Sequence, residues 1–192
     1  MFYAFDIIIC FIRTFFHLYK SEKGTNTRQA IGFIMALNIG DSLPDLIVNT
    51  THQEQISLIE LAGKNCVIYF YPKDSTPACT TEAQNFRDLM PEFAALNCTI
   101  IGVSRDSIKS HQRFTANECL AFELISDTDE TVCQTFDVIK LKNMYGKQVL
   151  GIERSTFLFI NGQLRHVWHK VKAQGHAQAV LDTLKNHQNS TS

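Results

Sequence analysis

Apolar and polar residues alternate along most of this chain in blocks that predict strands followed by helices. Val67 to Tyr71 is an uninterrupted apolar run, which is typical of a strand buried on both faces of a sheet. After it, apolar residues recur at helical spacing, at Ala83, Phe86, Leu89, Met90, Phe93 and Leu96. This pattern predicts a helix packed on the sheet, and the alternation of the two element types predicts an α/β fold.

The same alternation continues to the C-terminus. Asn161-Gly162 is a two-residue hairpin signal, and it predicts that the strands on either side of it pair. Residues 126–129 supply caps for a helix that continues to about Phe136. The other predicted strands are 99–103, 124–125, 156–160 and 164–168, and the other predicted helices are 107–117 and 176–185, the last with Ala179, Val180 and Leu184 facing the core.

Length and charge narrow the class of protein. With 192 residues, the chain is long enough for one domain that buries a core without disulfides or metals. The formal net charge is −1, and basic residues do not cluster in the sequence. The charge pattern therefore gives no support for a nucleic-acid-binding function.

The first 34 residues differ from the rest. Phe2 to Tyr19 is rich in aromatic and branched residues, but charged residues and a histidine interrupt it. The longest apolar run, Ile7 to Ile12, is far shorter than the ~20 residues that span a membrane. Asp6 precedes any basic residue, which is unlike a signal peptide. We expect a natural start at Met35, with residues 1–34 a poorly ordered extension; the alternative is a short helix that touches a membrane surface.

The six cysteines do not form a recognisable metal or disulfide pattern. They are Cys10, Cys66, Cys79, Cys98, Cys119 and Cys133. No two make a C-x-x-C pair, which argues against a zinc ribbon and against a redox dithiol of the thioredoxin type. Cys66 and Cys98 begin apolar runs, and we expect them in the core. A reducing, cytoplasmic setting is the default expectation.

Cys79 stands where a strand gives way to a helix. The apolar strand ends at Pro72, a short loop contains Thr76, and the helical pattern begins directly after Cys79. A helix N-terminus offers unpaired N–H groups and the positive end of the helix dipole, both of which favour an anion. A cysteine there is favoured as a reactive thiolate. The alternative is a small buried residue in the first turn of a helix.

The spacing Pro72-x3-Thr76-x2-Cys79 resembles the active-site signature of the peroxiredoxins. The longer run YFYPKDSTPACTTEAQNFRD resembles the PrxQ, or bacterioferritin comigratory protein, subfamily, and so do IGVSRDSIKSH and FDVIKLKNMYGKQVLGIERSTFLF further along the chain. The resemblance extends from about Met35 to Leu184. It implies that residues 35–192 form a thioredoxin-like domain, with a central mixed β-sheet flanked by helices.

The resemblance also implies an activity and a set of site residues. A thiol peroxidase of this kind reduces hydrogen peroxide and organic hydroperoxides through a cysteine sulfenic acid, serves antioxidant defence, and is recycled by thioredoxin or a similar dithiol. Cys79 is then the nucleophile, Thr76 contacts the peroxide or the sulfur, Pro72 shelters the thiolate, and Arg154 supplies the positive charge. No cofactor, metal, nucleic acid or membrane partner is implied, and a monomer is expected.

The cysteine that resolves the sulfenic acid is left open by the sequence. Many relatives place it five residues after the nucleophile, where this chain has Gln84. Others place it at the position of Thr115, and Cys119 lies four residues further on. Cys119 is therefore a displaced candidate, Cys133 a weaker one, and a one-cysteine mechanism with an external thiol is the third possibility.

Two other functions compete with the peroxidase. A peroxide sensor or holdase would use oxidation of Cys79 as a switch, and would not turn over with a reductant. A general thiol–disulfide oxidoreductase is disfavoured because no C-x-x-C pair is present. His111, in one of the matched blocks, is expected at the surface or at a helix end.

Overall fold

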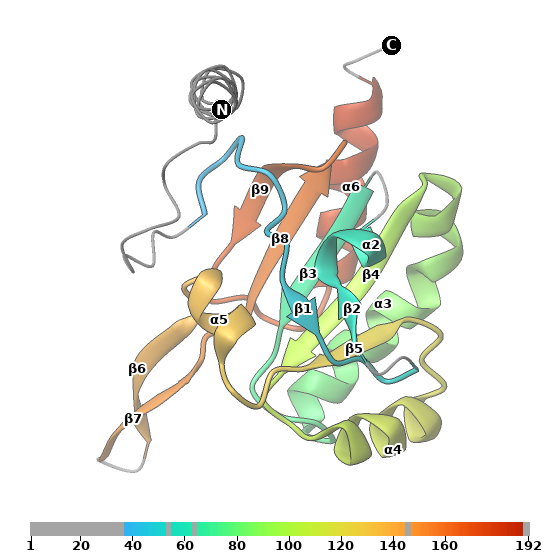
Figure 1. Ribbon diagram of the computed structural model, residues 1–192. Helices are drawn as coiled ribbons and strands as arrows, with labels where there is room; N and C mark the ends of the chain where they lie inside the picture. Colours follow the sequence, from blue (N-terminus) through green and yellow to red (C-terminus); the bar gives the residue numbers. More distant parts are fainter. Residues whose placement is uncertain (1–36, 53–54, 63–64, 145–146, 190–192) are drawn as a thin grey trace, which may run out of the picture. The chain divides into compact units, whose positions relative to one another are not determined.

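The computed structural model describes residues 37–52, 55–62, 65–144 and 147–189 of the chain (Figure 1). The helices are α2 Leu58–Ala62, α3 Pro77–Ala95, α4 Ile108–Glu118, α5 Thr131–Thr135 and α6 His176–Asn189. The strands are β1 Ile47–Val48, β2 Ile56–Ser57, β3 Asn65–Phe70, β4 Cys98–Ser104, β5 Glu123–Ser126, β6 Ile139–Met144, β7 Lys147–Ile152, β8 Ser155–Ile160 and β9 Gln163–Trp168.

Five strands form the central sheet, in the order β5-β4-β3-β8-β9. β3, β4 and β5 run parallel, whereas β8 is antiparallel to β3 and β9 is antiparallel to β8. Two further antiparallel pairs, β1 with β2 and β6 with β7, lie outside this sheet. A central mixed sheet flanked by helices is the architecture that the resemblance implied.

The middle strand β3 is buried on both faces, as its apolar run predicted. All six of its residues are buried. Cys66, Ile68 and Phe70 belong to one apolar cluster, together with side chains of α2 and α5. Val67 and Tyr69 belong to a second cluster, together with side chains of α3, α4 and α6. Successive residues of a strand point to opposite faces, so one continuous apolar run supplies both layers of the core.

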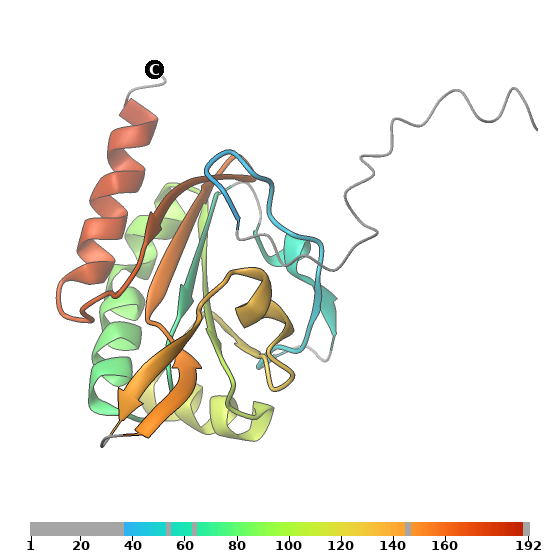
Figure 2. The same ribbon diagram turned by 90° about the vertical axis from the view of Figure 1, so that its left-hand side faces the viewer.

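Helices cover both faces of the sheet (Figures 1 and 2). α3 and α6 pack side by side on one face, and α2 and α5 lie on the other. The core-facing stripe of α6 differs in part from the prediction, because Ala179 is exposed. At 3.6 residues per turn, the face that contains Val180 and Leu184 also takes in Ala177 and Leu181 but excludes Ala179.

The hairpin predicted at Asn161-Gly162 is confirmed. β8 and β9 pair with Ile160 opposite Gln163, so Asn161 and Gly162 alone form the turn. Their φ angles are 51° and 74°. Positive φ at both central residues is the geometry for which an asparagine–glycine pair is suited.

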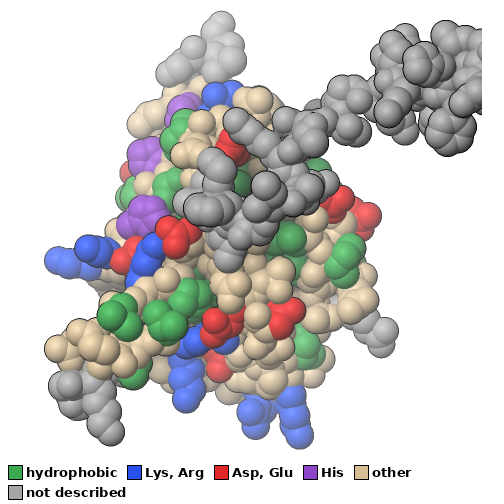
Figure 3. All heavy atoms as spheres, turned by 60° about the vertical axis from the view of Figure 1, so that its left-hand side comes forward, with side chains coloured by type: hydrophobic (Ala, Val, Ile, Leu, Met, Phe, Trp, Pro, Cys, Tyr) green, Lys and Arg blue, Asp and Glu red, His purple; other side chains and the backbone are tan. Residues whose placement is uncertain are grey.

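A second hairpin, formed by β6 and β7, was not predicted. It extends away from the central sheet (Figure 2). Leu141 and Leu150 are direct partners across it, and each is 63% exposed. Figure 3 shows hydrophobic side chains gathered on this side of the protein.

Residues 1–36 lie outside the described part of the chain, so the expectations about an N-terminal extension stay predictions. Within the residues that are described, none of the helices combines the length and apolar character needed to cross a membrane.

Candidate active site

Cys79 lies at the N-terminus of a helix, as predicted, although α3 begins at Pro77 and so contains Cys79 in its first turn. Thr76 is the N-cap of this helix, Pro77 is its first residue, and the N–H of Thr80 donates to the carbonyl of Thr76 at 2.9 Å. The backbone N–H of Cys79 precedes this first helical bond, so the helix itself offers it no acceptor. Its side chain is only 1% exposed. The sulfur is therefore held in a shielded place beside backbone donors and the positive end of the helix dipole.

Arg154 brings a positive charge to this sulfur. It immediately precedes β8, whose first residue, Ser155, pairs with Phe70 at the end of β3. This pairing places the start of β8 beside the loop that leads to Cys79. Nη2 of Arg154 donates to Sγ of Cys79 at 3.2 Å. The predicted pair of Cys79 and Arg154, which are far apart in the sequence, is thus formed by the antiparallel register of the central sheet.

Glu82 is a third residue of the site, beside Cys79 and Arg154, and was not among the predicted site residues. It follows Cys79 by three residues on α3, and its carboxylate accepts a hydrogen bond from Nη1 of Arg154. The side chain is fully buried, and its Oε1 has no partner among the described residues. Burial raises the pKa of Glu82 to about 7, although Arg154 opposes the shift. The i,i+3 spacing from Cys79 on a helix was the signal that could have revealed it.

The two arms of Arg154 therefore have different partners. One arm contacts the sulfur and the other contacts the carboxylate of Glu82. Burial acts to lower the pKa of Arg154, but the neighbouring Glu82 and Cys79 outweigh it and raise the pKa. A planar guanidinium can hold both contacts at once, which a lysine ammonium cannot do in the same geometry.

Thr76 and Pro72 lie in the loop that precedes Cys79. The hydroxyl of Thr76 donates to the carbonyl of Lys73 at 3.0 Å, and the side chain is partly exposed. Having donated this proton, the oxygen of Thr76 keeps lone pairs that can accept from a bound peroxide. Pro72 is exposed, two residues after the last residue of β3. Its role in sheltering the sulfur stays a prediction.

The loop itself is fastened to α4 and to the end of β4. Asp74 is buried, and its backbone N–H donates to Oδ2 of Asp106 at 2.8 Å. Its carboxylate accepts from the hydroxyl of Tyr71 at 2.8 Å and lies 2.9 Å from Nδ1 of His111. His111 is fully buried, so its expected place at the surface was wrong, whereas it does lie near a helix end, in the first turn of α4. The acidic partner that permits its burial lies 37 residues earlier, in a loop.

The candidates for the resolving thiol differ in exposure. Cys119 ends α4 with a left-handed backbone at φ 53° and is the one exposed thiol among the cysteines that the structure describes. Cys133 is fully buried, and burial together with the nearby carboxylate of Asp127 raises the pKa of its thiol. Cys66 and Cys98 are buried in the core, as predicted.

The position at which some relatives carry the resolving cysteine is also buried. Thr115 lies on α4, one turn before Cys119, and its hydroxyl has no partner among the described residues. Gln84, at the other such position, donates from Nε2 to the carboxylate of Glu118 at 2.7 Å. Nη1 of Arg87 donates to the backbone carbonyl of Glu118, also at 2.7 Å. These contacts fasten the end of α4 to α3 shortly after Cys79.

Metal-binding groups were not predicted. In the described part of the chain, no three histidine, cysteine or acidic side chains are grouped so that they could hold a metal ion.

Comparisons with known proteins agree with this geometry. Residues 39–167 match the AhpC/TSA family. Peroxiredoxin Bcp of Xanthomonas campestris pv. campestris is 58% identical over 144 residues, which are 74% of this chain and 90% of that protein.

Two solved structures have a similar fold. One is the bacterioferritin comigratory protein of X. campestris, studied for its alkyl peroxide reduction activity. It has a TM-score of 0.71, is 55% identical, and the match covers 77% of this chain and 99% of that one. The other is a cysteine-to-serine variant of PrxQ from Xylella fastidiosa, with a TM-score of 0.75, 43% identity and coverage of 80% and 99%. The chain therefore belongs to the AhpC/TSA family, in the PrxQ or Bcp branch of the peroxiredoxins, and is a peroxidase.

Proposed function

We propose that Cys79 is the peroxidatic thiol and that it reduces hydrogen peroxide and organic hydroperoxides to water and alcohols. The observation that carries this assignment is the 3.2 Å contact between the guanidinium of Arg154 and Sγ of Cys79, at the N-terminus of a helix. A cation and backbone donors together favour the thiolate, which is the reactive form of cysteine. The alkyl peroxide reduction for which the X. campestris relative was studied supports organic hydroperoxides as substrates.

The reaction begins with attack of the Cys79 thiolate on one oxygen of the peroxide. A sulfur–oxygen bond forms, the oxygen–oxygen bond breaks, and the other oxygen departs as hydroxide or alkoxide. A proton then makes it water or an alcohol, and Cys79 has become a sulfenic acid. Negative charge moves from sulfur to oxygen during this step. Arg154 and the N–H of Cys79 are donors close to the sulfur that can stabilise this charge.

Resolution of the sulfenic acid is assigned to Cys119. Its thiol would attack the oxidised sulfur, so that a disulfide forms and water leaves, and an external dithiol such as thioredoxin would then reduce the disulfide. The exposure of Cys119 and the contacts of its neighbour Glu118 with α3 support this choice. Cys133 is less suited, because it is buried and the pKa of its thiol is raised.

A reducing compartment, the cytoplasm, is proposed as the place of action. The five cysteines of the described part of the chain, Cys66, Cys79, Cys98, Cys119 and Cys133, are all free thiols in the structure. A cycle that depends on an external dithiol also needs a compartment in which that dithiol is kept reduced. The protein would then contribute to antioxidant defence and redox homeostasis.

The assignment can be tested with one equivalent of hydrogen peroxide. Reduced protein is treated with peroxide in the presence of a sulfenic-acid trap, and tryptic peptides are mapped by mass. We expect a disulfide between the Cys79 and Cys119 peptides in the unaltered protein, and a trapped sulfenic acid on Cys79 in Cys119→Ser. Cys98→Ser, which removes a core thiol, is the matched control and should keep the disulfide.

Two results would change the assignment. Peroxide consumption that survives in Cys79→Ser would remove Cys79 from its role. A trapped sulfenic acid in the unaltered protein, with no internal disulfide, would replace Cys119 by an external thiol. Steady turnover with thioredoxin and its reductase separates the peroxidase cycle from a sensor, which would be oxidised once and stop.

A further inference from the structure

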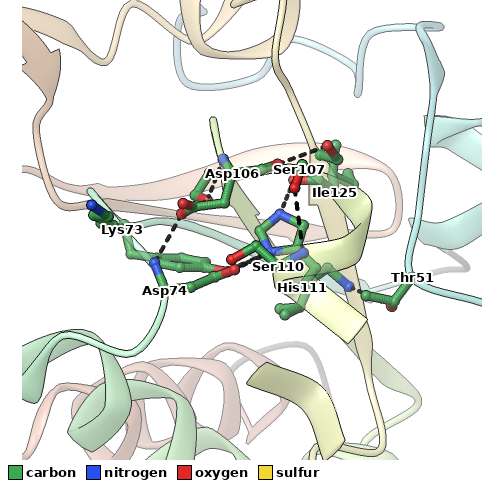
Figure 4. A network of polar contacts seen from close by, with 12 residues as sticks. Thr51, Lys73, Asp74, Asp106, Ser107, Ser110, His111 and Ile125 are labelled. Carbon is green, nitrogen blue, oxygen red and sulfur yellow. Dashed lines mark hydrogen bonds and ion pairs between the residues drawn. The ribbon is translucent and has the colours of Figure 1, made fainter. Parts of the chain in front are cut away.

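A buried polar network joins the loop before Cys79 to α4 and β5 (Figure 4). At its centre, the ring of His111 lies between the carboxylate of Asp74 and the backbone carbonyl of Ile125. Nδ1 is 2.9 Å from Oδ2 of Asp74, and Nε2 is 3.1 Å from the carbonyl oxygen. The side chains of both members of the pair are almost fully buried, at 0% and 3% exposed.

The geometry of this network points to a charged pair. Both ring nitrogens of His111 face oxygen acceptors, and only the doubly protonated ring donates to both of them. Asp74 remains a carboxylate in this place: burial acts to raise its pKa, but the hydrogen bond from His111 and its charge outweigh burial and lower the pKa. The hydroxyl of Tyr71 is a further donor to the same carboxylate, at 2.8 Å.

The pair fastens a loop, residues 72–76, that is otherwise largely exposed. Asp74 is the one residue of 72–76 that is fully buried, and its neighbour Ser75 has φ 56°, a backbone conformation that L-residues seldom adopt. The backbone N–H of Asp74 is also held, by Asp106, whose carboxylate accepts from the hydroxyl of Ser104 at 2.8 Å. Both the main chain and the side chain of Asp74 are therefore bound to the α4 side of the site.

Closure of this loop favours reduction of the peroxide, whereas its opening favours resolution of the sulfenic acid by a second thiol. Peroxide reduction needs Cys79 beside Arg154, as the structure has it. A second thiol, however, cannot reach a sulfur that is 1% exposed. Whichever thiol resolves the sulfenic acid, the loop or α4 has to move first.

We propose that Asp74 and His111 are positioning residues for Cys79: their ion pair holds the loop closed for the peroxide step, and its breaking sets how fast a thiol reaches the oxidised sulfur. The kinetic part of this proposal depends on the proposed role of Cys79. The structural part, that the ion pair controls access to the Cys79 sulfur, does not.

Access can be measured without peroxide. Reduced protein is labelled with a bulky maleimide under native conditions, and the rates at Cys79 and Cys119 are followed by peptide mass, with exposed Cys119 as the standard in the same sample. We expect His111→Gln and Asp74→Asn to label about tenfold faster at Cys79, the factor that corresponds to the loss of one hydrogen bond to a charged group. The matched control is His187→Gln, which removes an exposed histidine of α6 and should label at the unaltered rate.

The catalytic steps supply a readout that simple loss of stability would not give. A tenfold rise in a small opening constant leaves the closed form dominant, so the first-turnover reaction with peroxide should slow by less than about twofold. Capture of the oxidised sulfur by a thiol should speed up by about the same tenfold. A slower peroxide step without faster capture would overturn the proposal.

A second variant guards against failure of the first to fold, since removing one member of a buried pair leaves the other uncompensated. In Asp74→Asn/His111→Gln, two amides replace the two charges and can keep one hydrogen bond. Cys79 should again be labelled faster than in the unaltered protein, because a hydrogen bond between two neutral amides holds the loop less strongly than one between charged groups. Labelling of Cys79 at the unaltered rate in this variant, or equal acceleration in His187→Gln, would overturn the proposal. If Cys79 were not oxidised by peroxide, the proposed function would fail. The labelling rates would still test whether the ion pair of Asp74 and His111 controls access to the Cys79 sulfur.

Discussion

Arg154 is the residue on which the charge balance of the site depends, because it contacts both Cys79 and Glu82. In Arg154→Lys the charge stays, and Glu82 keeps a partner, but one ammonium cannot reach both groups as the guanidinium does. We expect the first-turnover rate with hydrogen peroxide to fall on the order of a hundredfold, the usual effect of losing one donor at a reacting centre. Stopped-flow measurement of that rate, with circular dichroism as a check on folding, tests this.

The control for Arg154 is Arg165→Gln, which removes an exposed arginine of β9 whose Nη2 donates to Oε1 of Gln163 at 2.7 Å. Its rate should equal that of the unaltered protein. An unchanged rate in Arg154→Lys would mean that positive charge alone, without the two-armed geometry, is sufficient.

Glu82 gives the protein a predictable dependence of stability on pH. Its pKa rises from the ordinary 4.5 to about 7 in the folded protein. Between these two values the folded protein retains a proton that the unfolded chain has released, so the free energy of unfolding falls as the pH rises through this window. The full change would be roughly 3 kcal/mol. Urea unfolding of Glu82→Gln from pH 4.5 to pH 7 should show a clearly flatter profile.

Glu92→Gln is the matched control for Glu82, because Glu92 lies on the same helix with its carboxylate exposed and paired to Lys185. Its profile should keep the slope of the unaltered protein. If Glu82→Gln kept the slope as well, another group would be responsible for the dependence.

Among the elements, the short helix α5 depends mainly on the side chain of Asp127. The buried carboxylate of Asp127 accepts from the N–H of Val132 at 2.9 Å and from the N–H of Cys133 at 2.7 Å. A helix of five residues cannot form without help, since its N–H groups have few partners of its own. Asp127→Ala should lower the free energy of unfolding by about 1–2 kcal/mol.

Asp129 offers the comparison for that experiment. It is exposed, and its Oδ1 accepts from the N–H of Thr131 at 3.2 Å. Asp129→Ala should therefore cost clearly less in the same urea titration. Equal losses in the two variants would contradict the assignment of Asp127 as the main cap of α5.

Elements with a strong local pattern were predictable from the sequence, and those that depend on distant partners were not. The run at residues 67–71 and the pair Asn161-Gly162 specify their structure locally, by apolar continuity and by positive φ. The β6–β7 hairpin was missed although Ile139 and Leu141 alternate with Lys140 and Lys142, because the alternation is short and Leu141 is exposed instead of buried in a core. Strands β1 and β2 have only two residues each, too few for any periodicity.

The same division applies to the site. Cys79 and Thr76 were predictable because a strand, a loop and a helix start follow one another in the sequence. Arg154 was placed by family resemblance, and only the register of β3 with β8 explains its position. The i,i+3 spacing places Glu82 on the same helix face as Cys79, but neither the burial of Glu82 beside Arg154 nor the pairing of Asp74 with His111 follows from a sequence pattern, which does not show which charge will be the neighbour.

For the molecule as a whole, the N-terminal segment lies outside the described part of the fold. The sheet, both apolar clusters and every residue assigned to the site lie between residues 37 and 189. The first strong attachments come just after residue 37: the N–H of Gly40 donates to the carbonyl of Leu164 at 2.8 Å, and the N–H of Leu164 donates to the carbonyl of Asp41 at 2.8 Å. A chain that begins at Met35 keeps them all.

We therefore expect the chain that begins at Met35 to unfold at the same temperature as the full chain and to react with peroxide at the same rate. A chain that begins at Ser42 is the matched control, because it loses both hydrogen bonds to Leu164 and frees the end of β9. It should unfold at a lower temperature, by several degrees for each kcal/mol lost. Equal unfolding temperatures for the full chain and the chain from Met35 would show that residues 1–34 contribute no stability to this fold. A drop that already appears on removal of residues 1–34 would show that this segment packs on the domain, since a segment that makes no contact cannot stabilise the folded state.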